Sequence, residues 1–348
     1  MAQLELEGSA VKIYDRPVAR CQRCGRPARV RLEYANAWLC DEHFLEYVVE
    51  KVRRNLTKYR MVAPGQTLLL AVSGGKDSVT LLDVLDKLAP QLGIKVVAVH
   101  IVLGLGKFSE ESLRAFSEAC SRARNVKCLT VDLKEIAGFY LPDLVKAVRR
   151  PACSVCGLVK RYILNAIAAE VGASSVATGH HLNDILAYVL KNFLLQEVGQ
   201  IAKLGPVDEA EGSAVRRVRP LFDVYEDETR AYARLAGLRP PSVDCPYKPR
   251  DTVEIRLKEA LDSLERGSPS MLISSIRKIA SNASIYSSAA SRGPLGRCKY
   301  CGMPASGGVC GFCSMTERVF GRPLGPEVLS RLRDKLRSEG LAAGANNL

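Results

Sequence analysis

The segment Ser73-Gly74-Gly75-Lys76-Asp77-Ser78 carries the clearest chemical signal in this chain. It follows the apolar run 67–72 and precedes a helical pattern of apolar residues over 79–88. A strand that ends in two glycines and opens a helix presents free backbone N–H groups and a positive helix end, so we expect a phosphate site and a bound nucleotide. The segment is not a Walker loop, because Leu70 stands where that loop needs glycine and Asp77 where it needs serine or threonine. The alternative is a serine-glycine turn at a helix N-cap, which needs neither the lysine nor the second serine.

Two cysteine-rich segments toward the two ends of the chain have the ligand spacing of zinc sites. The first set is Cys21, Cys24, Cys40 and His43, and the second is Cys298, Cys301, Cys310 and Cys313. Two ligand pairs separated by a short loop predict a closed tetrahedral site, in which the metal replaces a core that so short a segment cannot build. Disulfide or redox chemistry of the same pairs is the alternative.

A third C-x-x-C pair, Cys153 and Cys156, lies outside this pattern, and Cys245 follows later between prolines. We expect the pair in a loop that opens a helix near 157, where the helix dipole and nearby basic residues would lower the pKa of the thiols and make them reactive. The three cysteines suit an iron-sulfur cluster with one open iron, or persulfide and disulfide exchange. Spacing alone leaves open that Cys245 is a small buried apolar residue. The remaining cysteines, Cys120 and Cys128, are expected to be core residues.

The elements that must position these groups alternate as β-α units do. Apolar runs predict strands near 67–72, 95–101, 126–131 and 174–178, and helical periodicity predicts helices to 88 and over 110–122, 157–171 and 182–195. This pattern favours an α/β fold with a doubly wound parallel sheet, in which ligands bind at the carboxyl ends of the strands. We expect a long loop over 199–217 and a helix plus linker over 268–296. Three domains are predicted: 1–60, 61–267 and 268–348.

Composition points to a polyanionic partner. The formal net charge is +13, and it stays strongly positive after zinc thiolates are counted. Basic residues cluster over 20–31, 51–60 and 216–219, although each cluster alone is typical of an ordinary solvated face. No apolar stretch approaches the roughly 20 residues that span a bilayer, and no signal-peptide core is visible, so we expect a cytoplasmic protein without a membrane partner. Low amide content is a weak sign of a thermophile.

Several motifs together resemble the TtcA/TtuA group of tRNA thiolases, within the ATP pyrophosphatase (PP-loop) superfamily. They are the loop 73–78, the pair Cys153 and Cys156 followed by Lys160 and Arg161, Thr178-Gly179-His180 with Asp184, Cys245-Pro246, and the two terminal cysteine modules. The paired modules favour the TtuA and wobble-uridine branch. One position departs from the group, whose GHNLDD segment carries two aspartates where this chain has Asn183 and Asp184, so a Mg²⁺ role that needs both carboxylates is in doubt.

The resemblance implies a mechanism in which ATP adenylates a carbonyl oxygen of a tRNA base and sulfur then displaces AMP. It implies a 4Fe-4S cluster on Cys153, Cys156 and Cys245, and catalytic roles for Lys160 and Asp184. Ser73, Gly74, Gly75 and Ser78 would hold pyrophosphate, Lys76 would neutralise charge and Asp77 would orient the loop or Mg²⁺. Further nucleotide contacts are expected from Ala71, His100, Val102, Gly104, Gly179 and His180.

The implied substrate is the T-loop uridine, converted to 2-thiouridine with sulfur from a ubiquitin-like thiocarboxylate carrier protein, and the wobble uridine is the runner-up. Whether the chain forms a homodimer stays open. A PP-loop ligase with a nitrogen nucleophile would leave the three cysteines without a role. A non-catalytic zinc protein that binds RNA would explain the charge and the zinc pattern but not the open cysteine set.

Overall fold

A six-stranded sheet forms the centre of the molecule, in a computed structural model that describes residues 3–209, 215–287 and 296–342. The strand order is β11-β12-β10-β7-β8-β9, and β11 alone runs antiparallel to its neighbour. The bounds are β7 Thr67–Ala71, β8 Lys95–Val102, β9 Val126–Asp132, β10 Ala173–Ala177, β11 Val207–Asp208 and β12 Arg216–Val218. The predicted parallel α/β fold is therefore confirmed. From β7 the chain continues to β8 and β9 on one side and later returns to β10 on the other side. This change of direction is a topological switch point, and it lies at the end of the strand that carries the glycine loop.

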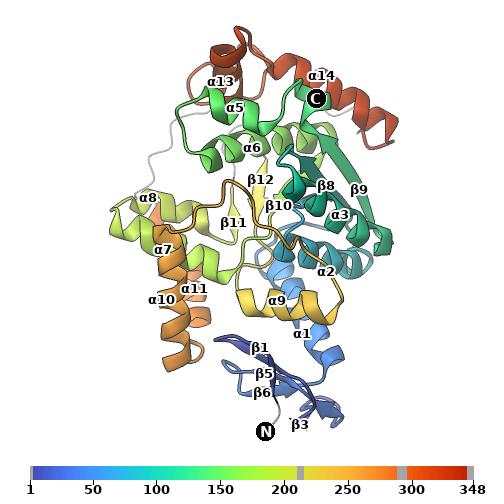
Figure 1. The fold of residues 1–348 in the computed structure, drawn as a ribbon, viewed down its shortest axis with the longest axis vertical. Coiled ribbons are helices and arrows are strands. Elements are labelled where there is room, and N and C mark those ends of the chain that lie inside the picture. Colours follow the sequence, from blue (N-terminus) through green and yellow to red (C-terminus); the bar gives the residue numbers. More distant parts are fainter. Residues whose placement is uncertain (1–2, 210–214, 288–295, 343–348) are drawn as a thin grey trace.

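Helices cover both faces of this sheet (Figure 1). The hydrophobic core on one face includes side chains from α1 Asp41–Lys58, α2 Lys76–Leu92, α3 Lys107–Arg122, α7 Leu182–Leu194, α9 Glu226–Leu235, α10 Val253–Gly267 and α11 Met271–Ser281, of which α10 and α11 pack against α7. The other face packs against α4 Leu133–Ala137, α5 Leu141–Ala147, α6 Ala152–Glu170, α13 Gly311–Phe320 and α14 Gly325–Ser338. Strand residues such as Leu68, Leu69 and Leu70 are fully buried, as expected for a parallel sheet covered on both sides.

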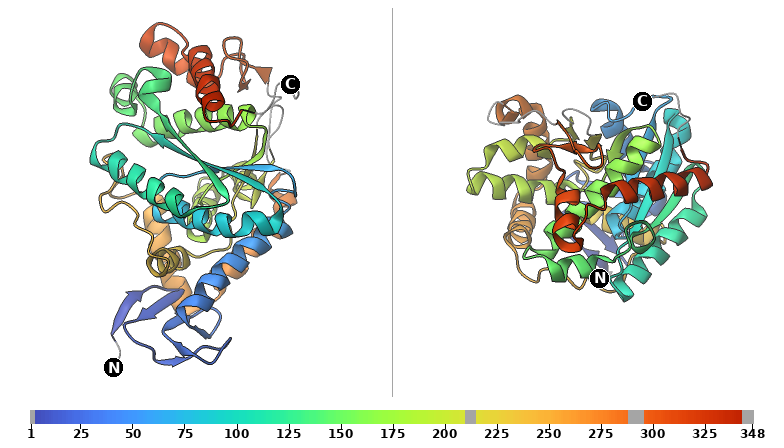
Figure 2. Two further views of the ribbon diagram at one scale, coloured as in Figure 1. Left: turned by 90° about the vertical axis from the view of Figure 1, so that its right-hand side faces the viewer. Right: turned by 90° about the horizontal axis from the view of Figure 1, so that it is seen from above.

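The two cysteine modules lie at opposite ends of the molecule (Figures 1 and 2). The N-terminal module contains a four-stranded antiparallel sheet of β1 Leu4–Glu7, β2 Val11–Tyr14, β5 Val30–Leu32 and β6 Ala37–Leu39, beside the hairpin β3 Ala19–Arg20 and β4 Pro27–Ala28. The C-terminal module contains the hairpin β13 Gly296–Arg297 and β14 Pro304–Ala305, followed by α13 and α14. Each module joins the hydrophobic core on one face of the central sheet.

Two sequence-based expectations need correction. Helix α6 begins at Ala152, directly after Pro151, so Cys153 and Cys156 lie within its first turns and not in a preceding loop. Pro151 can precede the helix because a proline at a helix start costs no hydrogen bond. Gly157 then lies inside the helix, where a single glycine is tolerated. The segment expected as a long loop holds α8 Val198–Ile201, a 3₁₀ turn, β11 and the start of β12, while 210–214 lie outside the described residues. The expected helix and linker over 268–296 hold α11 and α12 Ala283–Ser287, and 288–295 lie outside the described residues.

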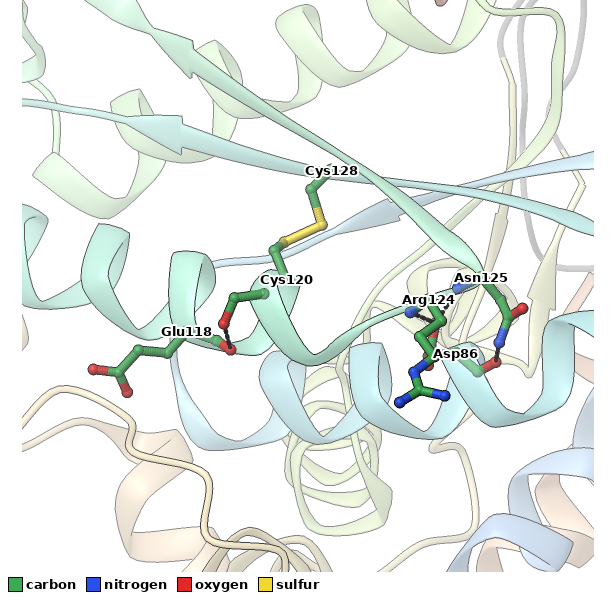
Figure 3. The surroundings of a disulfide bond; sticks show 7 residues. Asp86, Glu118, Cys120, Arg124, Asn125 and Cys128 are labelled. Atoms are coloured by element: carbon green, nitrogen blue, oxygen red, sulfur yellow. Dashed lines mark hydrogen bonds between the residues drawn. A yellow bond between two sulfur atoms is a disulfide. The ribbon is translucent and has the colours of Figure 1, made fainter.

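Cys120 and Cys128 are not separate core residues, because they form a disulfide with a Cα–Cα distance of 6.2 Å (Figure 3). The bond joins the end of α3 to β9. The chain reverses between these elements, and the Asp86 carboxylate fixes the turn by accepting hydrogen bonds from the backbone N–H groups of Arg124 and Asn125, at 2.9 and 2.6 Å. The pairing depends on this reversal, which the separation of eight residues along the chain does not reveal.

Helix α6 bears on the expectation that no segment of this chain is long and apolar enough to span a bilayer. Its 19 residues are long and apolar enough, by length and composition alone, to cross a bilayer. In the structure, however, Val155, Val159, Ile163 and Ile167 are buried against the central sheet and the C-terminal module. Core helices of soluble proteins satisfy the same test, so this helix is weak evidence for a membrane span.

Candidate functional site

The glycine-rich loop joins β7 to the first residue of α2. Gly74 has φ +86°, and a Cβ there would lie 2.6 Å from the carbonyl oxygen of Ser112, so only glycine fits. The Ser78 hydroxyl accepts a hydrogen bond from the Ser73 N–H at 3.1 Å and donates to the Gly75 carbonyl at 2.9 Å. The two serines therefore close the loop over the N-terminus of α2, where backbone N–H groups favour an anion.

Lys76 and Asp77 in the first turn of α2 are held by α9. The Lys76 ammonium lies 2.9 Å from an Asp77 carboxylate oxygen and 3.0 Å from the carboxylate of Glu226. Burial lowers the pKa of Lys76, but the two carboxylates outweigh it and raise that pKa above its ordinary value. The Thr229 hydroxyl donates to Asp77 at 2.5 Å. Lys76 thus stays charged beside the anion-binding end of the helix.

A cavity of about 430 Å³ extends from this loop to α6. Its walls include Ala71, Ser73, Asp77, Ser78, His100, Gly157, Lys160, Arg161, Gly179 and His180. The His100 ring donates from Nδ1 to the Val72 carbonyl at 2.9 Å, and burial lowers the pKa of this histidine. Val102 and Gly104, expected to contact the nucleoside, lie outside this wall, and a Cβ on Gly104 would clash with the Tyr140 ring.

The three isolated cysteines lie near one another at the start of α6, and none of them is among the residues that line this cavity. Cys153 is exposed, Cys156 and Cys245 are half-buried, and the Cys153 sulfur lies 3.8 Å from the Tyr247 carbonyl on the segment that carries Cys245. Burial raises the pKa of Cys156, although Lys160 one turn further along α6 opposes this effect. The lowered pKa expected for Cys156 is therefore wrong, because desolvation outweighs the nearby positive charge.

Asp184 lies in the first turn of α7, where His181 is the N-cap residue. Burial raises the pKa of Asp184, but His181 and Lys258 outweigh it and hold that pKa below its usual value. The adjacent Asn183 donates from its amide to Asp262 at 2.9 Å and accepts a hydrogen bond from the Glu226 N–H at 2.9 Å. An aspartate at position 183 would have no N–H group to donate to Asp262, and its negative charge would face the Asp262 carboxylate. These two effects account for the amide at this position.

The His181 ring marks where three acidic groups converge. Its Nε2 atom lies 3.3 Å from Asp184, 3.6 Å from Glu226 and 4.0 Å from Asp77. Burial raises the pKa of Glu226, but Lys76, together with His181 and Lys258, lowers it to about 2. Sequence reasoning missed Glu226 because no motif marks it. Its only signal is the acidic run that opens α9, which is also typical of a helix N-terminus.

Both predicted zinc sets are assembled. In the part of the chain that the structure describes, Cys21, Cys24, Cys40 and His43 bring their ligand atoms within 4.8 Å of one another, as do Cys298, Cys301, Cys310 and Cys313. These are the residues that could hold a metal ion. Within the first set, the Cys21 sulfur lies 3.4 Å from the His43 ring. Sulfur and imidazole ligands at tetrahedral spacing suit Zn²⁺.

One basic cluster has a structural role. Arg219 is buried and donates to the backbone carbonyls of Gly205 and Lys203, so it supports the segment before β11 and does not face solvent. Burial lowers the pKa of Arg219 to about 10. Arg216 pairs with Glu209 at 2.8 Å. The cluster 216–219 is therefore a weaker candidate for an RNA surface than its charge suggested.

Comparisons with known proteins agree with this geometry. A family model described as the PP-loop domain matches residues 48–240, and one described as the N-terminal LIM domain of the 2-thiouridine synthetase TtuA matches residues 20–45. The tRNA-5-methyluridine(54) 2-sulfurtransferases of Thermus thermophilus and Pyrococcus horikoshii are 38% and 35% identical, over 87% and 84% of this chain and 92% of each relative.

Among solved structures, the U34-tRNA thiolase NcsA from Methanococcus maripaludis, with its [4Fe-4S] cluster, has a similar fold. The TM-score is 0.70 at 23% identity, and the match covers 87% of this chain and 96% of that chain. This similarity supports the fold alone.

Proposed function

This chain belongs to the TtcA/TtuA family of PP-loop tRNA thiolases, and we propose that it replaces the 2-oxygen of the T-loop uridine of tRNA with sulfur. The relatives named tRNA-5-methyluridine(54) 2-sulfurtransferase support this substrate. The observation that carries the proposal is the shared cavity, because one wall is the phosphate-binding loop and another is the helix that bears Cys156 and Lys160. Activation by ATP and transfer of sulfur can then take place on one bound base.

The chemistry follows from the loop. The uridine O2 attacks the α-phosphorus of ATP, an O2–P bond forms and pyrophosphate leaves. The loop hydroxyls and N–H groups of Ser73, Gly74, Gly75 and Ser78 bind the pyrophosphate. Sulfur then attacks C2, and AMP departs with the former O2. Adenylation is needed because the unmodified carbonyl oxygen is a poor leaving group.

Lys76 and Asp77 act on the charges of the triphosphate. The Lys76 ammonium offsets negative charge that grows on the leaving pyrophosphate. Asp77 supplies a carboxylate oxygen for Mg²⁺, which accompanies ATP in such sites. We propose that ATP and Mg²⁺ bind here together, with Ala71, His100, Gly179 and His180 forming the wall around the nucleoside.

The donor set of Cys153, Cys156 and Cys245 fits a 4Fe-4S cluster. The three cysteines come from two segments and lie near enough for their charges to interact, beside Lys160, which lines the cavity. In the described part of the chain they are not among the sets whose ligand atoms lie within 4.8 Å of one another, as the ligands of a single ion do. When bound, such a cluster supplies an open iron that can hold sulfide. Lys160 places positive charge beside Cys156, and Asp184 holds a carboxylate 3.3 Å from the His181 ring, which also lies 4.0 Å from Asp77.

Each terminal module is proposed to hold one Zn²⁺, which gives two per chain. We propose tRNA as the substrate and a ubiquitin-like thiocarboxylate protein as the sulfur donor, in the cytoplasm. We retain the division into domains 1–60, 61–267 and 268–348 and the homodimer as proposals. Zinc and iron analysis of anaerobically purified protein tests the metal content, and iron that stays absent after anaerobic reconstitution would favour cysteine persulfides.

The runner-up substrate is the wobble uridine, because the paired cysteine modules favour the wobble-uridine branch of the family as well as the TtuA branch. The test uses two tRNAs, one with the T-loop uridine replaced and one with the wobble uridine replaced, each incubated with ATP and a sulfur source. We expect thiolation to disappear only with the T-loop change. Thiolation that survives this change and disappears with the wobble change would refute the T-loop assignment.

A further inference from the structure

The first turn of α9 contacts two parts of the molecule through four consecutive residues, Glu226, Asp227, Glu228 and Thr229. Glu226 and Thr229 face the phosphate-binding loop. Asp227 and Glu228 face the N-terminal module and α1. Helical residues three apart share a face, which accounts for the pairing of Glu226 with Thr229.

The contacts to the loop are short and well shielded. The Glu226 carboxylate lies 3.0 Å from the Lys76 ammonium, and the Thr229 hydroxyl donates to Asp77 at 2.5 Å. Thr229 is fully buried, and about a quarter of the Glu226 and Lys76 side chains is exposed. Lys76 has a long flexible side chain, so a fixed acidic partner restricts where its charge can lie.

The opposite contacts fix α9 itself. Asp227 accepts a hydrogen bond from the Ala10 N–H at 2.9 Å, and Glu228 pairs with Lys51 at 2.8 Å. Glu228 also accepts from the Tyr225 N–H at 2.7 Å, which closes a capping box at the start of the helix. The turn that holds Lys76 and Asp77 is thus anchored on its far side.

We propose that Glu226 and Thr229 are positioning residues for adenylation, and that they act through Lys76 and Asp77. This inference rests on the proposed function. Glu226 directs the ammonium toward the phosphates, and Thr229 fixes the rotamer of the Asp77 carboxylate that faces the metal and triphosphate. Misplacing a charged group by about 1 Å in such a site can cost on the order of 100-fold in rate.

The experiment measures kcat and KM for ATP in tRNA-dependent formation of AMP and pyrophosphate. Glu226→Gln keeps the shape and removes the charge, and Thr229→Val keeps the shape and removes the hydroxyl donor. We expect each to lower kcat by about 10- to 100-fold, with a smaller change in KM. Thr229→Ser keeps the donor and is expected to retain most of the wild-type kcat.

The matched control is Asp227→Asn, which lies on the same turn but contacts the N-terminal module. We expect it to lower the melting temperature and leave kcat unchanged. Wild-type kcat in Glu226→Gln and Thr229→Val would overturn the inference, as would a loss in Thr229→Ser equal to that in Thr229→Val. A wild-type chain that forms no AMP with tRNA would instead refute the proposed function, so the two failures are distinguishable.

Discussion

The buried ion pair between Lys51 and Glu228 offers the clearest stability prediction. Lys51 lies on α1 and Glu228 on α9, their charged atoms are 2.8 Å apart, and their side chains are 1% and 0% exposed. The Lys51 ammonium also lies 4.9 Å from the ring centre of Tyr34 and 5.3 Å from that of Tyr225. Lys51→Met removes the charge and keeps most of the apolar stem, so the Glu228 carboxylate is left buried without its cation.

The magnitude follows from this burial. Removing one partner of a buried ion pair costs about 3–5 kcal/mol, and hydrogen bonds to Glu228 from Tyr225 N–H and the Tyr34 hydroxyl remain to moderate the loss. We expect a decrease in unfolding free energy of about 4 kcal/mol. An unfolding entropy of about 2 cal/mol/K per residue, over 348 residues, converts this into a melting temperature lower by about 6 °C.

The assay is thermal unfolding followed by circular dichroism, with Arg53→Met as the control. Arg53 pairs with Glu50 on the same helix, but both side chains are 42% exposed, so this change is expected to cost less than about 1 kcal/mol. Combining Lys51→Met with Glu228→Gln removes the unpaired charge and should recover more than half of the loss. A single Lys51→Met variant that melts within 1 °C of wild type would refute the reasoning.

Four further predictions concern the site and the fold. Lys76→Ala is expected to abolish formation of AMP and pyrophosphate while tRNA binding, measured by filter retention, stays nearly unchanged. Cys245→Ala is expected to lose iron, seen as lost absorption near 400 nm, while zinc content stays the same. Replacing Cys120 with serine breaks the bond to Cys128 and should cost on the order of 2 kcal/mol without reductant and nothing with it. Burial raises the pKa of Asp223, but a neighbouring lysine and arginine outweigh burial and lower that pKa below its ordinary value of 3.8. The ionised Asp223 therefore stabilises the folded chain at pH values above 3.8. Its stabilisation relative to Asp223→Asn should be full at pH 7 and fall as the pH drops below about 4, and a difference independent of pH would contradict this.

Local patterns in the sequence were enough to predict the sheet and the phosphate loop. Continuous apolar runs specify strands buried on both faces, and two glycines between a strand and a helix specify the loop conformation, as the positive φ of Gly74 shows. The assembly of the two Cys and His ligand sets was predictable for the same reason, because their members lie close together along the chain.

Tertiary contacts were not predictable in the same way. Glu226 and Thr229 reach the loop from a helix about 150 residues further along the chain, and Cys120 meets Cys128 only because the chain reverses after α3. Gly157 favours a helix boundary in the sequence, whereas α6 begins five residues earlier, directly after Pro151. The raised pKa of Cys156 is not predictable from the sequence, because the burial that outweighs the charge of Lys160 arises only in the folded chain.

Transfer of an oxygen atom from the base to AMP tests the central claim most directly. A tRNA whose T-loop uridine carries ¹⁸O at O2 is incubated with ATP and a sulfur source, and the nucleotide products are analysed by mass spectrometry. Adenylation at O2 predicts one ¹⁸O atom in AMP for each uridine that gains sulfur. Thiolated tRNA accompanied by unlabelled AMP, or by ADP and phosphate, would contradict the account.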